Sequence, residues 1–120
     1  MSYDNNNIFA KILRGEIPCD KVFENDHALA FNDIAPQAPV HVLVIPKGEY
    51  ISIADFSAKA SAEEIKGFHD AITEIVNRSE IEEEGFRVIA NAGDHGGQEV
   101  PHYHLHILAG KPLGPMLAQL

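Results

Sequence analysis

Apolar positions along the chain follow two periods, and these periods predict where the helices and strands lie. Residues 8–14 carry Ile, Phe, Ile and Leu at helical spacing before a glycine, which predicts a short helix. Residues 61–78 open with a Ser-x-x-Glu capping box and continue with one apolar stripe, which predicts the main helix. The sequence therefore predicts one short and one long helix.

Shorter apolar runs predict strands, and the strongest of them, residues 40–46, is rich in β-branched residues. The five runs are residues 21–24, 28–32, 40–46, 85–91 and 102–109. The prolines of residues 35–39 place a loop between the second and third runs. We therefore expect an α+β fold with an antiparallel meander sheet of about five strands, and a single domain over residues 1–120.

Charge and cysteine content limit the partners and the compartment. The chain has 18 acidic and 9 basic residues and a net charge of -9, which disfavours binding to a nucleic-acid backbone. Its single cysteine, Cys19, forms no internal disulfide, and residues 1–7 lack the basic and apolar regions of a signal peptide. No apolar run approaches the ~20 residues that span a bilayer. We therefore expect a cytoplasmic protein without a nucleic-acid or membrane partner.

Candidate chemistry is concentrated near the C-terminus, where His102, His104 and His106 alternate with apolar residues. In an extended chain, alternate side chains project from one face about 6.6 Å apart, so the three imidazoles can line one small pocket. Residues 94–100, directly upstream, form a glycine-containing loop whose backbone N–H groups can approach an anion closely. The combination predicts a phosphate site beside a row of histidines.

The spacing of the histidines leaves two chemical uses open. His102 and His104 could share Zn²⁺ with a third ligand, as in a mononuclear zinc hydrolase. Alternatively, one neutral imidazole attacks phosphorus while its neighbours donate hydrogen bonds to the developing charge. Histidines that only satisfy one another in a polar patch are the least expected reading, because three of seven histidines in 120 residues fall at a strict period of two. The glycine-containing loop favours phosphate chemistry.

Residues 102–108, three alternating histidines followed by apolar residues, resemble the signature of the histidine-triad (HIT) family. The similarity to the HINT branch of this family extends over nearly the whole chain. The matching segments are residues 8–12, 15–18, 31–34, 36–41, 44–47, 96–100 and 112–117.

This resemblance implies a HIT fold and a nucleotidyl hydrolase or transferase that needs no cofactor. The implied substrates are purine nucleoside monophosphate conjugates, typically adenosine 5′-phosphoramidates, cleaved through a covalent nucleotidyl-histidine intermediate. His104 takes the nucleophile position, His102 and His106 flank it as further catalytic residues, and His41 supports the triad from a neighbouring strand. A nucleotide-sensing or partner-binding protein without activity remains an alternative.

The resemblance also assigns substrate contacts. Asp33 occupies the position that binds the ribose hydroxyls, and Asn91 a position that contacts the phosphate or the leaving group. Glu99 stands where many HINT proteins have a serine beside the leaving group. The phosphate-side loop comprises Gly97, Gln98, Glu99 and Val100, and the apolar base pocket comprises Ile8, Phe9, Ile12, Ile17, Phe31, Ile34 and Leu43.

Two further expectations follow from the resemblance. Some HIT proteins hold a structural zinc through a Cys-x-x-Cys pair, but Asn7 and Ala10 occupy those positions here, so we expect no metal site. The family's dimeric habit implies a homodimer whose tail, residues 112–120, reaches the partner's pocket. The remaining histidines, His27, His69 and His95, are expected at the surface.

Overall fold

A computed structural model describes residues 2–118 of the chain. Five strands form one antiparallel sheet in the order β1-β2-β3-β5-β4. Their bounds are β1 Lys21–Glu24, β2 Ala28–Asn32, β3 Val40–Pro46, β4 Phe86–Ile89 and β5 Leu105–Ala109. The expected α+β class with a five-stranded antiparallel sheet is confirmed.

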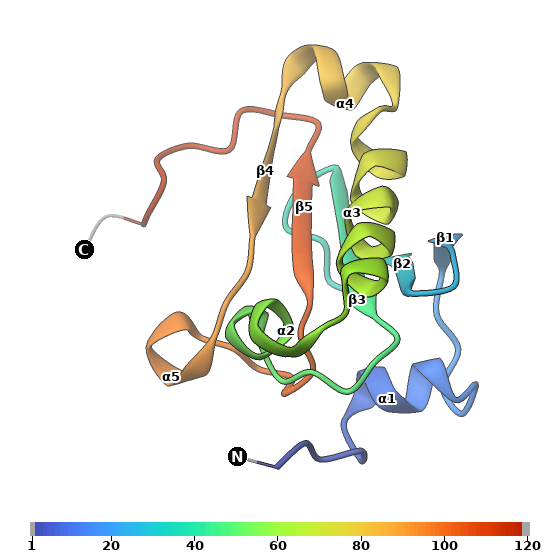
Figure 1. Cartoon of the computed structure of the whole chain (residues 1–120). Coiled ribbons are helices and arrows are strands. Elements are labelled where there is room, and N and C mark those ends of the chain that lie inside the picture. The colour runs from blue at the N-terminus through green and yellow to red at the C-terminus, as the bar shows by residue number, and fades with distance from the viewer. Residues whose placement is uncertain (1, 119–120) are drawn as a thin grey trace.

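The long helix α3 covers one face of this sheet (Figure 1). The helices are α1 Ile8–Leu13, α2 Ile53–Lys59, α3 Ala62–Val76, α4 Ser79–Glu84 and α5 Gly93–Gly96. The capping box is confirmed, because the Glu64 N–H donates to the Ser61 hydroxyl and the Ser61 N–H donates to the Glu64 carboxylate, both at 3.1 Å. α3 ends two residues before the predicted boundary.

β2 and β3 are buried on both faces, which explains why their sequences are largely apolar, with Asn32 at the exposed end of β2 and His41 as the polar residue within β3. Alternate residues of these strands, such as Ala30 and Val44, face the core under α3 together with Phe68. The intervening residues face a second apolar cluster, to which α1 contributes Phe9. This second cluster lies on the face of the sheet that carries the candidate chemistry.

Gly67 allows α3 to approach the turn between β1 and β2. A Cβ atom at this position would lie 2.8 Å from the Cβ atom of His27, closer than real contacts permit. The Asn25 side-chain amide donates to the Gly67 carbonyl at 2.8 Å and fixes the approach. The main helix is thereby held against the β1–β2 hairpin.

Several expected details of the secondary structure were wrong. β5 lies between β3 and β4, so only the first three strands form a meander. The last strand begins at Leu105 instead of residue 102, because the N–H groups of His102 and Tyr103 donate to carbonyl groups outside the sheet. Three short helices were not predicted, and one of them, α4, contains the four glutamates of residues 80–84.

Residues 110–118, which follow β5, have no regular structure, as their prolines and glycines predict, and they run back past β4 (Figure 1). The Arg87 guanidinium of β4 donates to the carbonyl oxygens of Gly114 at 2.8 Å and Pro115 at 3.2 Å, and so holds this tail. None of the helices within residues 2–118 has the length and apolar character to cross a bilayer.

Candidate active site

The three histidines meet at one place because the chain stays extended ahead of β5. His106 lies in β5, and His102 and His104 lie in the segment that leads into it. The alternation of side chains continues through this segment. Tyr103 packs into the core under α3, whereas His104 faces the opposite way and meets Phe9 edge to face at 5.0 Å between ring centroids. The one-sided row expected from the sequence is present.

His102 is fully buried, and both of its ring nitrogens have protein partners. Nε2–H donates to the Pro46 carbonyl oxygen at 2.8 Å, and the Tyr3 hydroxyl donates to Nδ1. Burial lowers the pKa of His102 to about 4, so the ring is neutral at pH 7. His102 therefore supports the site from behind and leaves no ring nitrogen free for a substrate or a metal.

His104 has one ring nitrogen fixed and one free. Its Nδ1–H donates to the His102 carbonyl oxygen at 2.8 Å, and this bond fixes the tautomer with the lone pair on Nε2. Burial lowers the pKa of His104, against the raising effects of that hydrogen bond and of the Asp33 and Glu99 carboxylates. The ring is therefore neutral at physiological pH, with an unengaged lone pair on Nε2.

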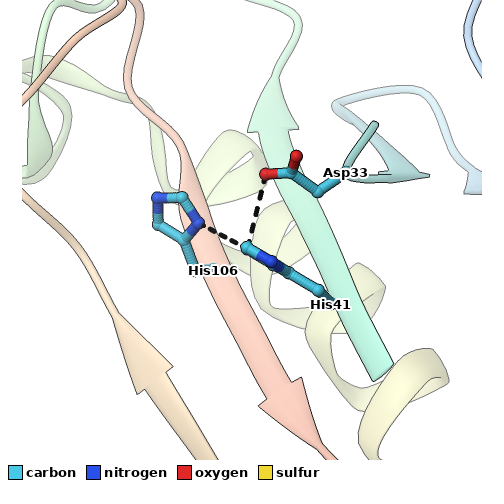
Figure 2. Close-up of side chains that lie close together, drawn as sticks. All are labelled: Asp33, His41 and His106. Carbon is cyan, nitrogen blue, oxygen red and sulfur yellow. Dashed lines mark hydrogen bonds and ion pairs between the residues drawn. The ribbon is translucent and has the colours of Figure 1, made fainter. Parts of the chain in front are cut away.

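Asp33 and His41 form a chain of contacts with His106, the last histidine of the row (Figure 2). The backbone N–H of Gln37 donates to His41 Nδ1 at 3.1 Å, which places the proton of His41 on Nε2. The Nε2–H group of His41 lies 2.9 Å from His106 Nδ1 and 3.4 Å from the Asp33 carboxylate, measured from Nε2. His106 consequently carries its own proton on Nε2. Burial, followed by the charges of His104 and His41, lowers the pKa of His106 to about 4.

The same three side chains could be considered as metal ligands, because their donor atoms lie within 4.8 Å of one another. A metal on His41 Nε2 would need the lone pair of that nitrogen, and the ring proton would move to Nδ1. There it would oppose the Gln37 N–H, so that two donors faced each other. The hydrogen-bond pattern of Asp33, His41 and His106 thus suits proton donation better than metal binding.

A pocket of about 570 Å³ opens in front of His104 and His106. Its volume is typical of small-molecule sites. Among the described residues, its wall contains two carboxylates, those of Asp33 and Glu99, and no lysine or arginine. A second pocket of about 480 Å³ lies around Lys21, Glu24 and Lys47 and contains none of the histidines.

Most of the predicted site residues line the first pocket. They are Ile8, Phe9, Ile12, Ile17, Phe31, Asp33, Ile34, Leu43, Asn91, Gly97, Glu99, Val100, His104 and His106. Ile34 is 96% exposed and lies at the rim. The predicted residues His41, His102 and Gln98 are not in the wall of the pocket. Each forms a hydrogen bond with a residue of the wall, namely His106, His104 and Val100, respectively.

Sequence reasoning missed several members of this site. Pro18, Cys19, Asn32, Ala35 and Gln37 also line the pocket, and the Tyr3 hydroxyl contacts His102 from the N-terminal segment. Pro18 and Cys19 directly follow Ile17, a predicted pocket residue, and this adjacency is the feature of the sequence that could have identified them. Of the remaining histidines, His69 and His95 are exposed as expected, and His27 is half-buried against α3.

The loop after α5 contributes Gly97, Glu99 and Val100 to the wall of the pocket. Gly97 adopts the left-handed conformation, with φ of 74°, and turns the chain toward the histidines. The Gln98 amide donates to the carbonyl oxygens of Ile51 at 2.6 Å and Val100 at 2.9 Å, which anchors the loop. Within residues 2–118, the N–H groups of Glu99 and Val100 have no protein acceptor. They are suited to bind the oxygens of an anion.

Known proteins resemble this chain over almost its full length. The model of the HIT domain matches residues 14–113. A HIT-like protein of Azospirillum brasilense is 54% identical over 118 residues, 98% of this chain and 97% of that protein. The purine nucleoside phosphoramidase of Escherichia coli K12 is 46% identical over 111 residues, 92% of each chain.

Solved structures give the same result. A HIT family hydrolase from Legionella pneumophila superposes with a TM-score of 0.81 at 39% identity, over 89% of this chain and 95% of that one. Since the family model, the relatives and the structure agree, this chain belongs to the HIT family and is a hydrolase of that family.

Proposed function

We propose that this protein hydrolyses purine nucleoside 5′-phosphoramidates, typically those of adenosine, through a covalent intermediate on His104. The observation that carries the proposal is the fixed tautomer of His104, whose free Nε2 lone pair belongs to a neutral ring in the wall of a nucleotide-sized pocket. The E. coli relative named as a purine nucleoside phosphoramidase supports this substrate class.

In the first step, His104 Nε2 attacks phosphorus, the Nε2–P bond forms and the P–N bond breaks. The leaving nitrogen keeps the bonding electron pair and takes one proton from solvent. The His104 ring becomes cationic, and the His102 carbonyl oxygen that holds Nδ1–H stabilises it. The Asp33 and Glu99 carboxylates, which raise the pKa of His104, favour the same cation.

In the second step, water attacks phosphorus, the P–Nε2 bond breaks and its electron pair returns to the ring. Water gives up one proton, so the products are a nucleoside monophosphate and an amine. His106 Nε2–H and the N–H groups of Glu99 and Val100 donate to the phosphoryl oxygens during both steps. Fixed donors need no reorganisation as charge develops.

The remaining pocket residues bind the nucleoside. The Asp33 carboxylate accepts hydrogen bonds from the ribose hydroxyls. The base lies among the apolar side chains near α1, including Phe9, Ile17 and Leu43. Asn91, on the side of the phosphate loop, contacts the phosphate or the leaving group.

Hydrogen bonding argues against a zinc hydrolase that uses the histidine row. His102 has no free ring nitrogen to bind zinc. His104 has one free nitrogen, Nε2, and zinc bound there would occupy the lone pair that attacks phosphorus.

Purified protein incubated with a panel of fluorogenic adenosine 5′-phosphoramidates tests the proposal. Release of amine and adenosine monophosphate supports it, whereas tight binding of adenosine monophosphate without turnover identifies a nucleotide-binding protein that is not an enzyme.

We further propose that the active unit is a cytoplasmic homodimer formed around the exposed edge of β4. Phe86 and Val88 on this strand are 43% and 42% exposed. Met116 and Leu117 of the neighbouring tail are 86% and 79% exposed, and apolar patches of this kind mark interfaces. The tail of one protomer then reaches the partner's pocket and contacts the leaving group.

A further inference from the structure

The pocket around His104 holds an unusual balance of charge for a site that binds a phosphoryl anion. Among the described residues, its wall contains the carboxylates of Asp33 and Glu99 and no lysine or arginine. The chain as a whole has a net charge of -9. Backbone and imidazole N–H groups therefore bind the phosphoryl group without any fixed positive charge beside it.

The two carboxylates in the wall differ in their partners. The Asp33 side chain is 19% exposed, accepts from the Ala35 N–H at 2.8 Å and faces His41 Nε2 at 3.4 Å. Glu99 is exposed, and its carboxylate forms no hydrogen bond or ion pair with any residue in the range 2–118. The charge of Asp33 is thus engaged within the site, and that of Glu99 is available to a ligand.

The position of Glu99 is fixed even though its carboxylate is free. Gln98, the residue before it, accepts from the Gly93 N–H at 3.2 Å and donates to the Ile51 and Val100 carbonyl oxygens. These bonds hold the backbone on both sides of Glu99. Its charge is also close enough to the nucleophile to raise the pKa of His104.

We propose that Glu99 selects phosphoramidates whose leaving amine carries a second, positively charged group. This inference rests on the proposed phosphoramidase function and adds the charge class of the leaving group. The apolar side chains near α1 surround the end of the pocket assigned to the base, and Glu99 lies with Gly97 and Val100 in the phosphate loop. A substituent on the leaving nitrogen therefore meets the Glu99 carboxylate, which attracts an ammonium group and repels a carboxylate.

The expected size of the preference follows from one charge pair in a partly solvated site. A free energy of about 1.4 kcal/mol corresponds to a tenfold change in kcat/KM, which lies within the range for a pair at intermediate dielectric. The preference decreases with salt, because the Debye length falls from about 10 Å at 0.1 M to about 3 Å at 1 M. Both effects depend on the charge of Glu99 and not on its size.

The test uses three adenosine 5′-phosphoramidates of five-carbon amines, ending in an ammonium, a methyl or a carboxylate group. The wild type is compared with Glu99→Gln, which removes the charge, and Glu99→Lys, which reverses it. Glu82→Gln is the matched control, because it removes one charge from an exposed residue of α4, at the opposite end of the sheet from α5 (Figure 1).

We expect the wild type and the Glu82 control to prefer the ammonium substrate over the methyl substrate about tenfold in kcat/KM at low salt. The Glu99→Gln variant should show no preference, and Glu99→Lys should prefer the carboxylate substrate. Equal rates for all three substrates in the wild type, or an unchanged preference in Glu99→Gln, would overturn the role of Glu99. Failure of the wild type to cleave even the methyl substrate would instead refute the proposed function.

Discussion

Acid should destabilise this protein through His102, and the effect can be estimated from the structure. His102 is fully buried, and its pKa lies at about 4 in the folded state, against about 6.5 in an unfolded chain. The unfolded state therefore binds more protons between these two values, and the free energy of unfolding decreases as the pH falls through this range. Stability due to neutral His102 is fully present above about pH 6.5.

The magnitude follows from the linkage relation. At pH 5 the unfolded imidazole is almost fully protonated and the folded one is mostly neutral. Because this pH lies about 1.5 units below the unfolded pKa, the free energy of unfolding decreases by about 2 kcal/mol. A change of 2 kcal/mol is a large part of the stability of a small domain. Urea unfolding at pH 7 and pH 5 measures it directly.

Two variants isolate the contribution of His102. His102→Gln removes the titrating group, so this variant should be less stable at pH 7 but should lose about 2 kcal/mol less than the wild type between pH 7 and pH 5. His69→Gln, the same change on an exposed face of α3, should follow the wild-type profile. Equal pH dependence for all three proteins would refute the assignment of the acid sensitivity to His102.

Further predictions concern the loop, the helix contact, the metal and the tail. Gln98→Ala should lower kcat/KM at least tenfold with little change in Tm, because it frees the phosphate loop; a wild-type rate would refute this. Gly67→Ala should lower Tm despite a helix-propensity gain of up to about 1 kcal/mol, since its Cβ meets His27 at 2.8 Å, and a higher Tm would contradict the contact. Protein freed of metal by a chelator, as checked by elemental analysis, should keep full activity. Truncation after Gly110 should change selectivity among leaving amines more than among nucleobases, and an unchanged amine profile in a dimer would remove the tail from the site.

The sequence predicted elements whose signals are local. The capping box at Ser61 is complete within four residues, and the apolar runs of β2 and β3 reflect burial on both faces. The start of β5 was mispredicted because the Tyr103 N–H donates to the Tyr50 carbonyl oxygen, a contact between distant segments. No periodic pattern within one segment contains this information.

The candidate site also combines features that the sequence predicts with features that only the folded chain determines. The alternating histidines indicated their shared face, since side-chain alternation is a property of the extended backbone. The tautomer of His41 depends instead on the backbone N–H of Gln37, a group that every residue except proline has at that position. Likewise, Tyr3 reaches His102 across 99 residues of sequence, so only the folded chain could assign it to the site.

The central claim is that His104 Nε2 becomes bonded to phosphorus. Mixing the protein with an equimolar adenosine 5′-phosphoramidate, quenching within one turnover and measuring the mass of the intact protein and its peptides tests this claim most directly. We predict a nucleotidyl adduct on the peptide containing His104 in the wild type. His104→Ala should form no adduct and should lose several orders of magnitude in rate. A variant that keeps a tenth of the wild-type rate, or a wild type that turns over without any adduct, would contradict the account.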